Sequence, residues 1–205
     1  MKETKEKVSI AVRPGTIDDI PQAHAINIHY VLNTVTTFQQ TPSLLAEFEA
    51  KFRSITARGL PFLVAVERPA SSSSDVIIGY AHLTPFRGTK LSYAPSVELS
   101  IYLHHSHTGK GTGSLLLATL LATASSPEGG GIIHCPIENS NYSTSGHHER
   151  SADEPYGYPI RNIIACMALD PEGKDTGEWL CQWYAKQGFV ERGRLKQVGF
   201  KKDKW

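Results

Sequence analysis

The segment HTGKGTGS, residues 107–114, restricts the fold of this chain more than any other, because three glycines alternate with other residues where a strand should give way to a helix. VELSIYLHH before it is strand-like, and LLLATLLATA after it is helix-like. Such a junction presents unpaired backbone N–H groups at the positive end of a helix dipole, which favours a phosphate or pyrophosphate. Glycine lets the backbone approach the anion without an intervening Cβ. A tight turn without any ligand is the alternative interpretation.

Two common nucleotide-binding motifs are absent from this segment. GxxxxGK[ST] needs a lysine after its second glycine, whereas Lys110 precedes Gly111. The GxGxxG fingerprint of dinucleotide-binding proteins is also absent, because the third glycine has the wrong spacing and the segment does not follow the first strand of the chain. The pattern that remains is [Arg/Gln]-x-x-Gly-x-[Gly/Ala], with Thr108 at its first position.

Hydrophobic periodicity along the rest of the chain predicts strands and helices in the order β, α, α, β, β, β, α, β, α, β. Hairpins come first and crossover units later, which is typical of an α+β protein with a mixed sheet. In the second helix, a single apolar stripe is expected from Leu44, Leu45, Phe48, Phe52 and Ile55. The predicted strands are 8–12, 61–68, 75–83, 95–105, 161–169 and 191–200, and the predicted helices are 16–31, 43–59, 113–124 and 177–187.

The length of 205 residues fits one domain, residues 1–205. Residues 125–158 are rich in Gly, Ser, Asn, His and Pro, and we interpret them as a loop insertion in which GGGIIHCPI is the only candidate strand.

Composition excludes several classes of partner. The formal net charge of +1 makes nucleic acid and acidic membrane surfaces poor partners. No apolar run approaches the ~20 residues of a membrane helix, and the N-terminus lacks the apolar centre of a signal peptide. Cys135, Cys166 and Cys181 form no CxxC pair and are expected to be reduced, mostly buried thiols. A cytoplasmic location is the expectation.

The glycine segment resembles the acetyl-CoA loop of the GNAT superfamily of N-acetyltransferases, although Thr108 stands where that family has Arg or Gln. SVELSIYLHHSHTGKGTGSLLL, NTVTTFQQTP and RGRLKQVGFKKDKW are similar to blocks of its phosphinothricin acetyltransferase branch. The resemblance implies an acyl-CoA N-acyltransferase fold, in which helices flank a central, mostly antiparallel sheet, and acetyl-CoA as co-substrate. It also implies a bulge in the strand before the loop. The implied acetyl-CoA-binding residues are Ile101, Tyr102, Leu103, Thr108, Gly109, Lys110, Gly111, Thr112, Gly113 and Ser114.

Transfer of an acetyl group to an amine needs a base for the amine, a polarised carbonyl and a proton for the leaving thiolate. Strand alternation places Glu98, Ser100 and Tyr102 on one face, opposite Val97 and Leu99. The resemblance implies that Glu98 is the general base, directly or through water, and that Tyr184 is the general acid. A hydrogen-bonded structural glutamate and an aromatic core residue are the alternative interpretations.

The acceptor expected from the resemblance is a small amino acid or a phosphinothricin-like analogue. Its pocket is expected in two loops, and Arg87 could bind a carboxylate through two hydrogen bonds. The candidate acceptor-binding residues are Tyr30, Thr36, Phe38, Phe86, Arg87 and Tyr93.

Other functions remain open from the sequence. The acceptor could be a polyamine or a protein amine, or the chain could be a non-catalytic CoA-binding module, which the Thr108 and Gly177 departures from the family pattern would favour. No metal is expected, because His104, His105, His107, His147 and His148 match no metal-ligand spacing. The first three flank the glycine loop and could assist it electrostatically. The branch has one more strand after the segment matching KKDKW. The sheet could be completed instead by residues 125–158 or by another subunit, which would make a homodimer.

Overall fold

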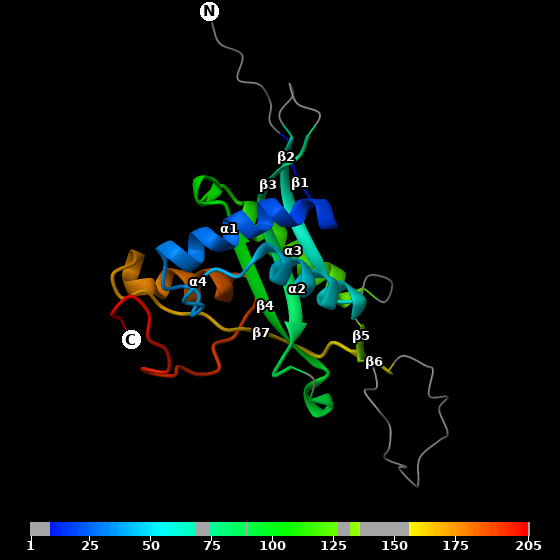
Figure 1. Ribbon diagram of the computed structural model, residues 1–205. Coiled ribbons are helices and arrows are strands. Elements are labelled where there is room, and N and C mark those ends of the chain that lie inside the picture. Colours follow the sequence, from blue (N-terminus) through cyan, green and yellow to red (C-terminus); the bar gives the residue numbers. More distant parts are fainter. Residues whose placement is uncertain (1–8, 69–73, 89, 127–131, 136–155, 205) are drawn as a thin grey trace, which may run out of the picture.

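The computed structural model describes residues 9–68, 74–88, 90–126, 132–135 and 156–204 (Figure 1). Its main sheet has the strand order β1-β2-β3-β4-β7. The first four strands pair antiparallel and β7 pairs parallel with β4, which confirms the predicted mixed, mostly antiparallel sheet. The strands are β1 (Ser9–Pro14), β2 (Phe62–Arg68), β3 (Val76–Pro85), β4 (Ser96–Leu103) and β7 (Asn162–Ala165).

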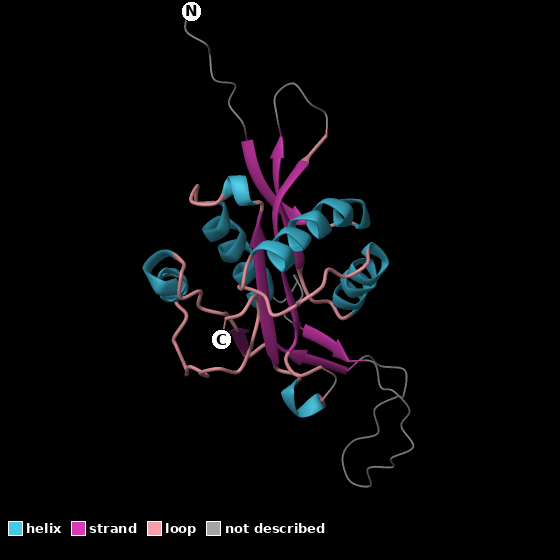
Figure 2. Cartoon of the chain, turned by 60° about the vertical axis from the view of Figure 1, so that its left-hand side comes forward, coloured by secondary structure: helices cyan, strands magenta, loops and turns pink. Residues whose placement is uncertain are grey.

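A second, two-stranded sheet lies within the predicted insertion. It pairs β5 (Ile132–Cys135) antiparallel with β6 (Tyr156–Pro159), beside one end of the main sheet (Figures 1 and 2). The strand expected in GGGIIHCPI is thus confirmed, but the expectation that it is the only strand of residues 125–158 was wrong, because β6 begins at Tyr156. Residues 136–155 of the insertion, with His147 and His148, lie outside the described residues.

Helices cover both faces of the main sheet. In Figure 1, α1 (Ile20–Asn33) and α2 (Leu45–Ala57) lie in front of it and α3 (Thr112–Ser125) lies behind. The fourth helix, α4 (Glu178–Lys186), lies to one side, near β4 and β7. Short 3-10 helices occupy Ile17–Asp19, Leu91–Tyr93, His105–His107 and Lys174–Gly177.

The predicted alternation in β4 is confirmed. Val97 and Leu99 are buried on the face that α3 covers, where Leu116, Leu117 and Leu120 are fully buried. The opposite face carries the polar and aromatic residues of β4, and Tyr102 packs edge-on against Tyr30 of α1. Burial of apolar side chains on the α3 side therefore holds β4 with its polar face toward α1 and α2.

Four expectations about local structure were wrong. The stripe of α2 is narrower than predicted, since Leu44 and Leu45 are exposed. The bulge falls in the β2–β3 pairing at Ala65/Val66, whereas β3 and β4 pair in continuous register. The two cysteines whose burial is described are less buried than predicted, since Cys166 is exposed and Cys181 half-buried. No strand forms at 191–200, because this segment has no neighbouring strand of the described residues with which to form a ladder.

Candidate active site

A gap opens beside β4 in the sheet. Pairing with β7 covers β4 only as far as Leu99, which lies opposite Ala165, and β4 then continues to Leu103. The N–H of His104 donates to Ile78 of β3, so strand alternation turns the N–H groups of Ile101 and Leu103 the other way, toward the gap. Among the described residues, β4 therefore has an unpaired edge beyond Leu99, and this edge forms without a bulge in β4.

The N-terminus of α3 follows this free edge directly. Gly111 caps the helix with φ of 84°, a left-handed conformation that favours glycine. The N–H groups of Gly111 through Ser114 donate no hydrogen bond to any described residue. Four free donors at the positive end of a 14-residue helix form an anion-binding site.

Side chains around the glycine loop hold its shape. The ammonium of Lys110 donates to the carbonyl of Ser106 at 3.0 Å, and the Thr108 hydroxyl donates to that of His105 at 3.2 Å. The indole of Trp183 on α4 donates to the Ser114 hydroxyl at 3.2 Å. Thr108 thus stabilises the turn itself, and α4 is attached to the start of α3.

The strand register aligns polar residues on the α1–α2 face. Glu98 lies opposite Thr84 on β3, and Ser100 lies opposite His82. Glu98 is half-buried. Burial is the largest cause of the raised pKa values of Tyr102 on its own strand and of Cys166 just after β7, and the charge of Glu98 raises both further. Its carboxylate therefore acts on groups on both sides of the gap.

Tyr102 links this face to α4 and to the loop after α1. Burial, and after it the electrostatic effect of Tyr102, raise the pKa of Tyr184 well above the usual tyrosine value. Burial raises the pKa of Tyr102, and the side chain of Thr37, in the loop after α1, partly offsets this upward shift. Tyr184 is 7% exposed, and its hydroxyl forms no hydrogen bond with any described residue. A protonated hydroxyl is thus left free near the end of β4.

The predicted acceptor residues fall into two groups, three on α1 or in the loop after it and three near the start of β4. Tyr30 donates to the carbonyl of Leu103 at 2.9 Å, near the end of β4. Phe86 and Tyr93 pack edge-on near the start of β4, with Arg87 over the Tyr93 ring at 5.9 Å. The remaining two, Thr36 and Phe38, lie in the loop after α1, where the Thr36 hydroxyl bonds that of Thr34 and Phe38 is 51% exposed.

The sequence analysis missed His82. This side chain is 1% exposed, and its Nδ1 has no hydrogen-bond partner. Burial, followed by the charge of Lys51, lowers its pKa well below the usual histidine value, so the ring is neutral at physiological pH. A histidine inside the apolar segment VIIGYAHL was the available signal.

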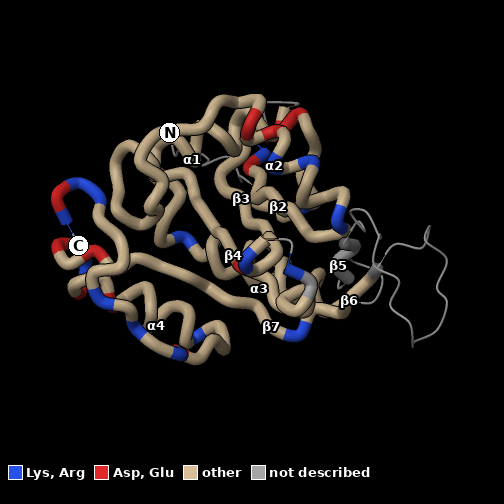
Figure 3. The backbone as a smooth tube through the Cα atoms, turned by 60° about the horizontal axis from the view of Figure 1, so that its bottom comes forward, with Lys and Arg blue, Asp and Glu red and all other residues tan. Residues whose placement is uncertain are grey.

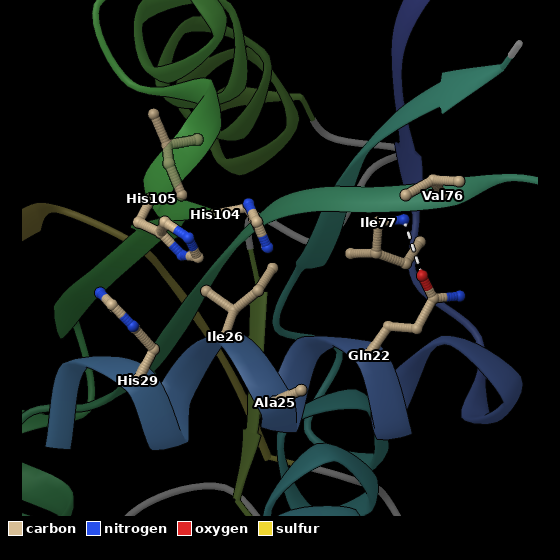
Figure 4. Close-up of a pocket in the computed structure, with 9 residues that line it drawn as sticks. Gln22, Ala25, Ile26, His29, Val76, Ile77, His104 and His105 are labelled. Atoms are coloured by element: carbon tan, nitrogen blue, oxygen red, sulfur yellow. Dashed lines mark hydrogen bonds between the residues drawn. The ribbon is translucent and has the colours of Figure 1, made fainter. Parts of the chain in front are cut away.

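A cavity of about 280 Å³ lies between α1 and the nearby ends of β3 and β4 (Figure 4). His29, His104 and His105 line one end, where His105 stacks on both of the others. At the other end Gln22 accepts a hydrogen bond from the N–H of Ile77. No residue of the glycine loop lines this cavity, so it is separate from the anion site.

The histidines beside the glycine loop form hydrogen bonds with nearby side chains. The Ser106 hydroxyl bridges the Nδ1 atoms of His104 and His107 at 2.8 and 2.9 Å, and His107 also contacts Glu67. Among the described residues, no three His, Cys, Asp or Glu side chains are placed to hold a metal ion. Within the same residues, no helix has the length and apolar character needed to cross a membrane.

Comparison with known proteins agrees with this geometry. The model of the acetyltransferase (GNAT) family matches residues 29–151. A phosphinothricin N-acetyltransferase of Alcaligenes faecalis is 29% identical over 97% of this chain and 79% of its own. An L-methionine sulfoximine/L-methionine sulfone acetyltransferase of Pseudomonas paraeruginosa is 30% identical over 84% of this chain and 91% of its own. The crystal structure of a phosphinothricin acetyltransferase from Sinorhizobium meliloti in complex with acetyl-CoA matches 96% of this chain and 83% of its own, with a TM-score of 0.69 and 26% identity.

Proposed function

Since this chain belongs to the GNAT family of acetyltransferases, we propose that it transfers the acetyl group of acetyl-CoA to the primary amine of a small amino acid or analogue. The observation that carries the proposal is the free edge of β4 running directly into the unpaired N–H groups of α3. Relatives named for phosphinothricin and methionine sulfoximine support the choice of acceptor. The cytoplasmic location and the homodimer stay predictions.

The residues around the gap have the chemistry that each part of acetyl-CoA requires. The free N–H groups of Gly111–Ser114 would bind the pyrophosphate. The N–H groups of Ile101 and Leu103 would bind the pantetheine arm and polarise the thioester carbonyl. The start of α3 lies close to the end of β4 at Gly113, since a Cβ on this residue would lie 3.3 Å from the Leu103 side chain.

The transfer is completed by the following proton and bond changes. Glu98 accepts a proton from the ammonium form of the acceptor, directly or through a water, and the freed lone pair attacks the thioester carbon. The carbon–sulfur bond breaks, and Tyr184 donates its proton to the leaving thiolate. The attacking nitrogen releases its second proton to solvent, so that an amide and the free thiol result, and the proton on Glu98 returns to Tyr184 through solvent.

The test of this function is turnover on a panel of amines. Calorimetry with acetyl-CoA should show binding, and release of the CoA thiol should follow with phosphinothricin, methionine sulfoximine or another small amino acid. Binding without turnover on any amine would favour the non-catalytic module. Absence of binding would contradict the assignment of the glycine loop to pyrophosphate.

Tyr184→Phe is expected to lower kcat about 10- to 30-fold, because it removes the proton donor while water still reaches the thiolate. Since the pKa of Tyr184 is raised, the wild-type hydroxyl stays protonated above its usual titration range. The kcat of the wild type should therefore not fall between about pH 8 and about pH 10. Steady-state kinetics over that range check both points, with the acetyl-CoA Kd as the control for folding. An unchanged kcat in the variant would remove Tyr184 from the mechanism.

A further inference from the structure

His82 lies on β3, on the same face of the main sheet as Glu98. In the strand register it stands between Phe62 of β2 and Ser100 of β4. The next residue of β3 on this face, Thr84, stands opposite Glu98. Glu98 is therefore the diagonal neighbour of His82, a position at which the two residues are about 7–8 Å apart. That spacing leaves room for one water between the two side chains.

Two aromatic rings fix the orientation of the His82 imidazole. The ring stacks on Phe62 with 5.4 Å between centroids and on Tyr80 with 6.1 Å, at interplanar angles of 22° and 26°. Phe62 occupies the β2 side of His82, whereas the neighbour on the β4 side is the small side chain of Ser100. The Ser100 hydroxyl forms no hydrogen bond with any described residue. It is thus available to a group that binds beside the ring.

The two ring nitrogens of His82 have different surroundings. Nδ1 is closed off from solvent and has no hydrogen-bond partner. Nε2 also forms no hydrogen bond with any described residue, but it is not closed off from solvent. A buried N–H group without an acceptor is rarer in proteins than a buried acceptor without a donor, so the favoured tautomer carries its proton on Nε2. The ring therefore presents an N–H donor to the polar face.

This donor belongs to a neutral ring. Charged residues of both signs lie on α2, which covers the face (Figure 3). Burial, and after it the charge of Lys51 on this helix, lower the pKa of His82 well below the usual histidine value. A neutral imidazole donates a hydrogen bond without competing for the proton that the base must take.

We propose that His82 is a positioning residue that, together with Ser100, holds the water through which Glu98 takes the proton of the acceptor. This inference rests on the proposed function and selects the water-mediated form of its first step. The water accepts from Nε2–H of His82 and from the acceptor ammonium, and it donates to the Glu98 carboxylate and the Ser100 hydroxyl. One N–H bond of the ammonium breaks as its proton passes to the water, and the water gives a different proton to Glu98. The water is thus restored, and His82 keeps its own proton.

The test is His82→Phe, measured with and without the Glu98 carboxylate. This variant keeps an aromatic ring against Phe62 and Tyr80 but removes the N–H donor. Its kcat should fall about 3- to 10-fold, the effect of one hydrogen bond. In the Glu98→Gln background the same replacement should change kcat by less than about twofold, because no base remains to take the proton from the water. A purely structural role would lower kcat by the same factor in both backgrounds.

Two further variants serve as controls. His82→Gln places an amide N–H near the position of Nε2, and it should recover most of the kcat that His82→Phe loses. His24→Phe is the matched control, since this buried histidine bonds to the carbonyl of Ser43 and packs on Phe48, outside the main sheet. Its kcat should equal that of the wild type. Calorimetry with acetyl-CoA confirms that each variant is folded.

The outcomes separate this inference from the proposed function. An equal loss in both backgrounds, or no recovery in a folded His82→Gln, would overturn the role of His82 while leaving the acetyltransferase intact. If the wild type acetylates no amine, ¹H–¹⁵N NMR of the imidazole decides. An Nε2–H tautomer whose signal shifts in Glu98→Gln supports the water bridge. An Nδ1–H tautomer, or a signal that Glu98→Gln leaves unchanged, overturns it.

Discussion

Glu98→Gln is expected to lower kcat by about 10²- to 10³-fold while leaving the acetyl-CoA Kd within about twofold. The substitution keeps the size of the side chain and its place between Thr84 and Ile164 in the sheet, and removes only its ability to accept a proton. Thiol-release kinetics and calorimetry measure the two quantities.

A second experiment, with a series of acceptors, tests whether Glu98 acts as the base. Acceptors whose amines have lower pKa values need less help from a base, so the defect of Glu98→Gln should shrink along such a series. Glu49→Gln on α2 is the matched control, and it should behave as the wild type. A defect that is equal for every acceptor, or one that appears in KM alone, would contradict the assignment of Glu98 as the base.

Gly79→Val should lower the free energy of unfolding by about 3 kcal/mol and weaken acetyl-CoA binding as well. Gly79 lies on β3 opposite Leu103, and a Cβ there would lie 2.5 Å from the Leu103 side chain and 3.0 Å from the Tyr102 carbonyl oxygen. Relief of that overlap must move the end of β4, whose N–H groups face the gap. Urea unfolding and calorimetry with acetyl-CoA check the two effects.

The control for this prediction is Gly193→Val. A Cβ on Gly193 would meet no atom within 4 Å, so its stability should change by less than about 0.5 kcal/mol. If Gly79→Val does not fold, Gly79→Ala provides the smaller overlap needed for a measurement. A Gly79 variant as stable as the Gly193 variant would show that the end of β4 moves freely and does not hold a fixed gap.

Local patterns in the sequence were sufficient to predict most of the elements. The alternation in VELSIYL placed Glu98 and Tyr102 on one face of β4, and the glycines of residues 109–113 marked the helix start. Both signals are local, because side-chain direction in a strand and backbone freedom at a turn depend on residues adjacent in the chain. The mixed sheet followed from the order of hairpins and crossovers.

The tertiary structure decided what depends on distant partners. The strand predicted at 191–200 did not form, because a strand needs a neighbour and its own alternation cannot supply one. The burial of Lys201 was equally invisible, since it arises only when the C-terminal segment packs against the loop after α1, far away in the sequence. The sequence alone therefore determined the glycine turn at the start of α3 and the polar face of β4, whereas only packing decided which charged and polar side chains become buried.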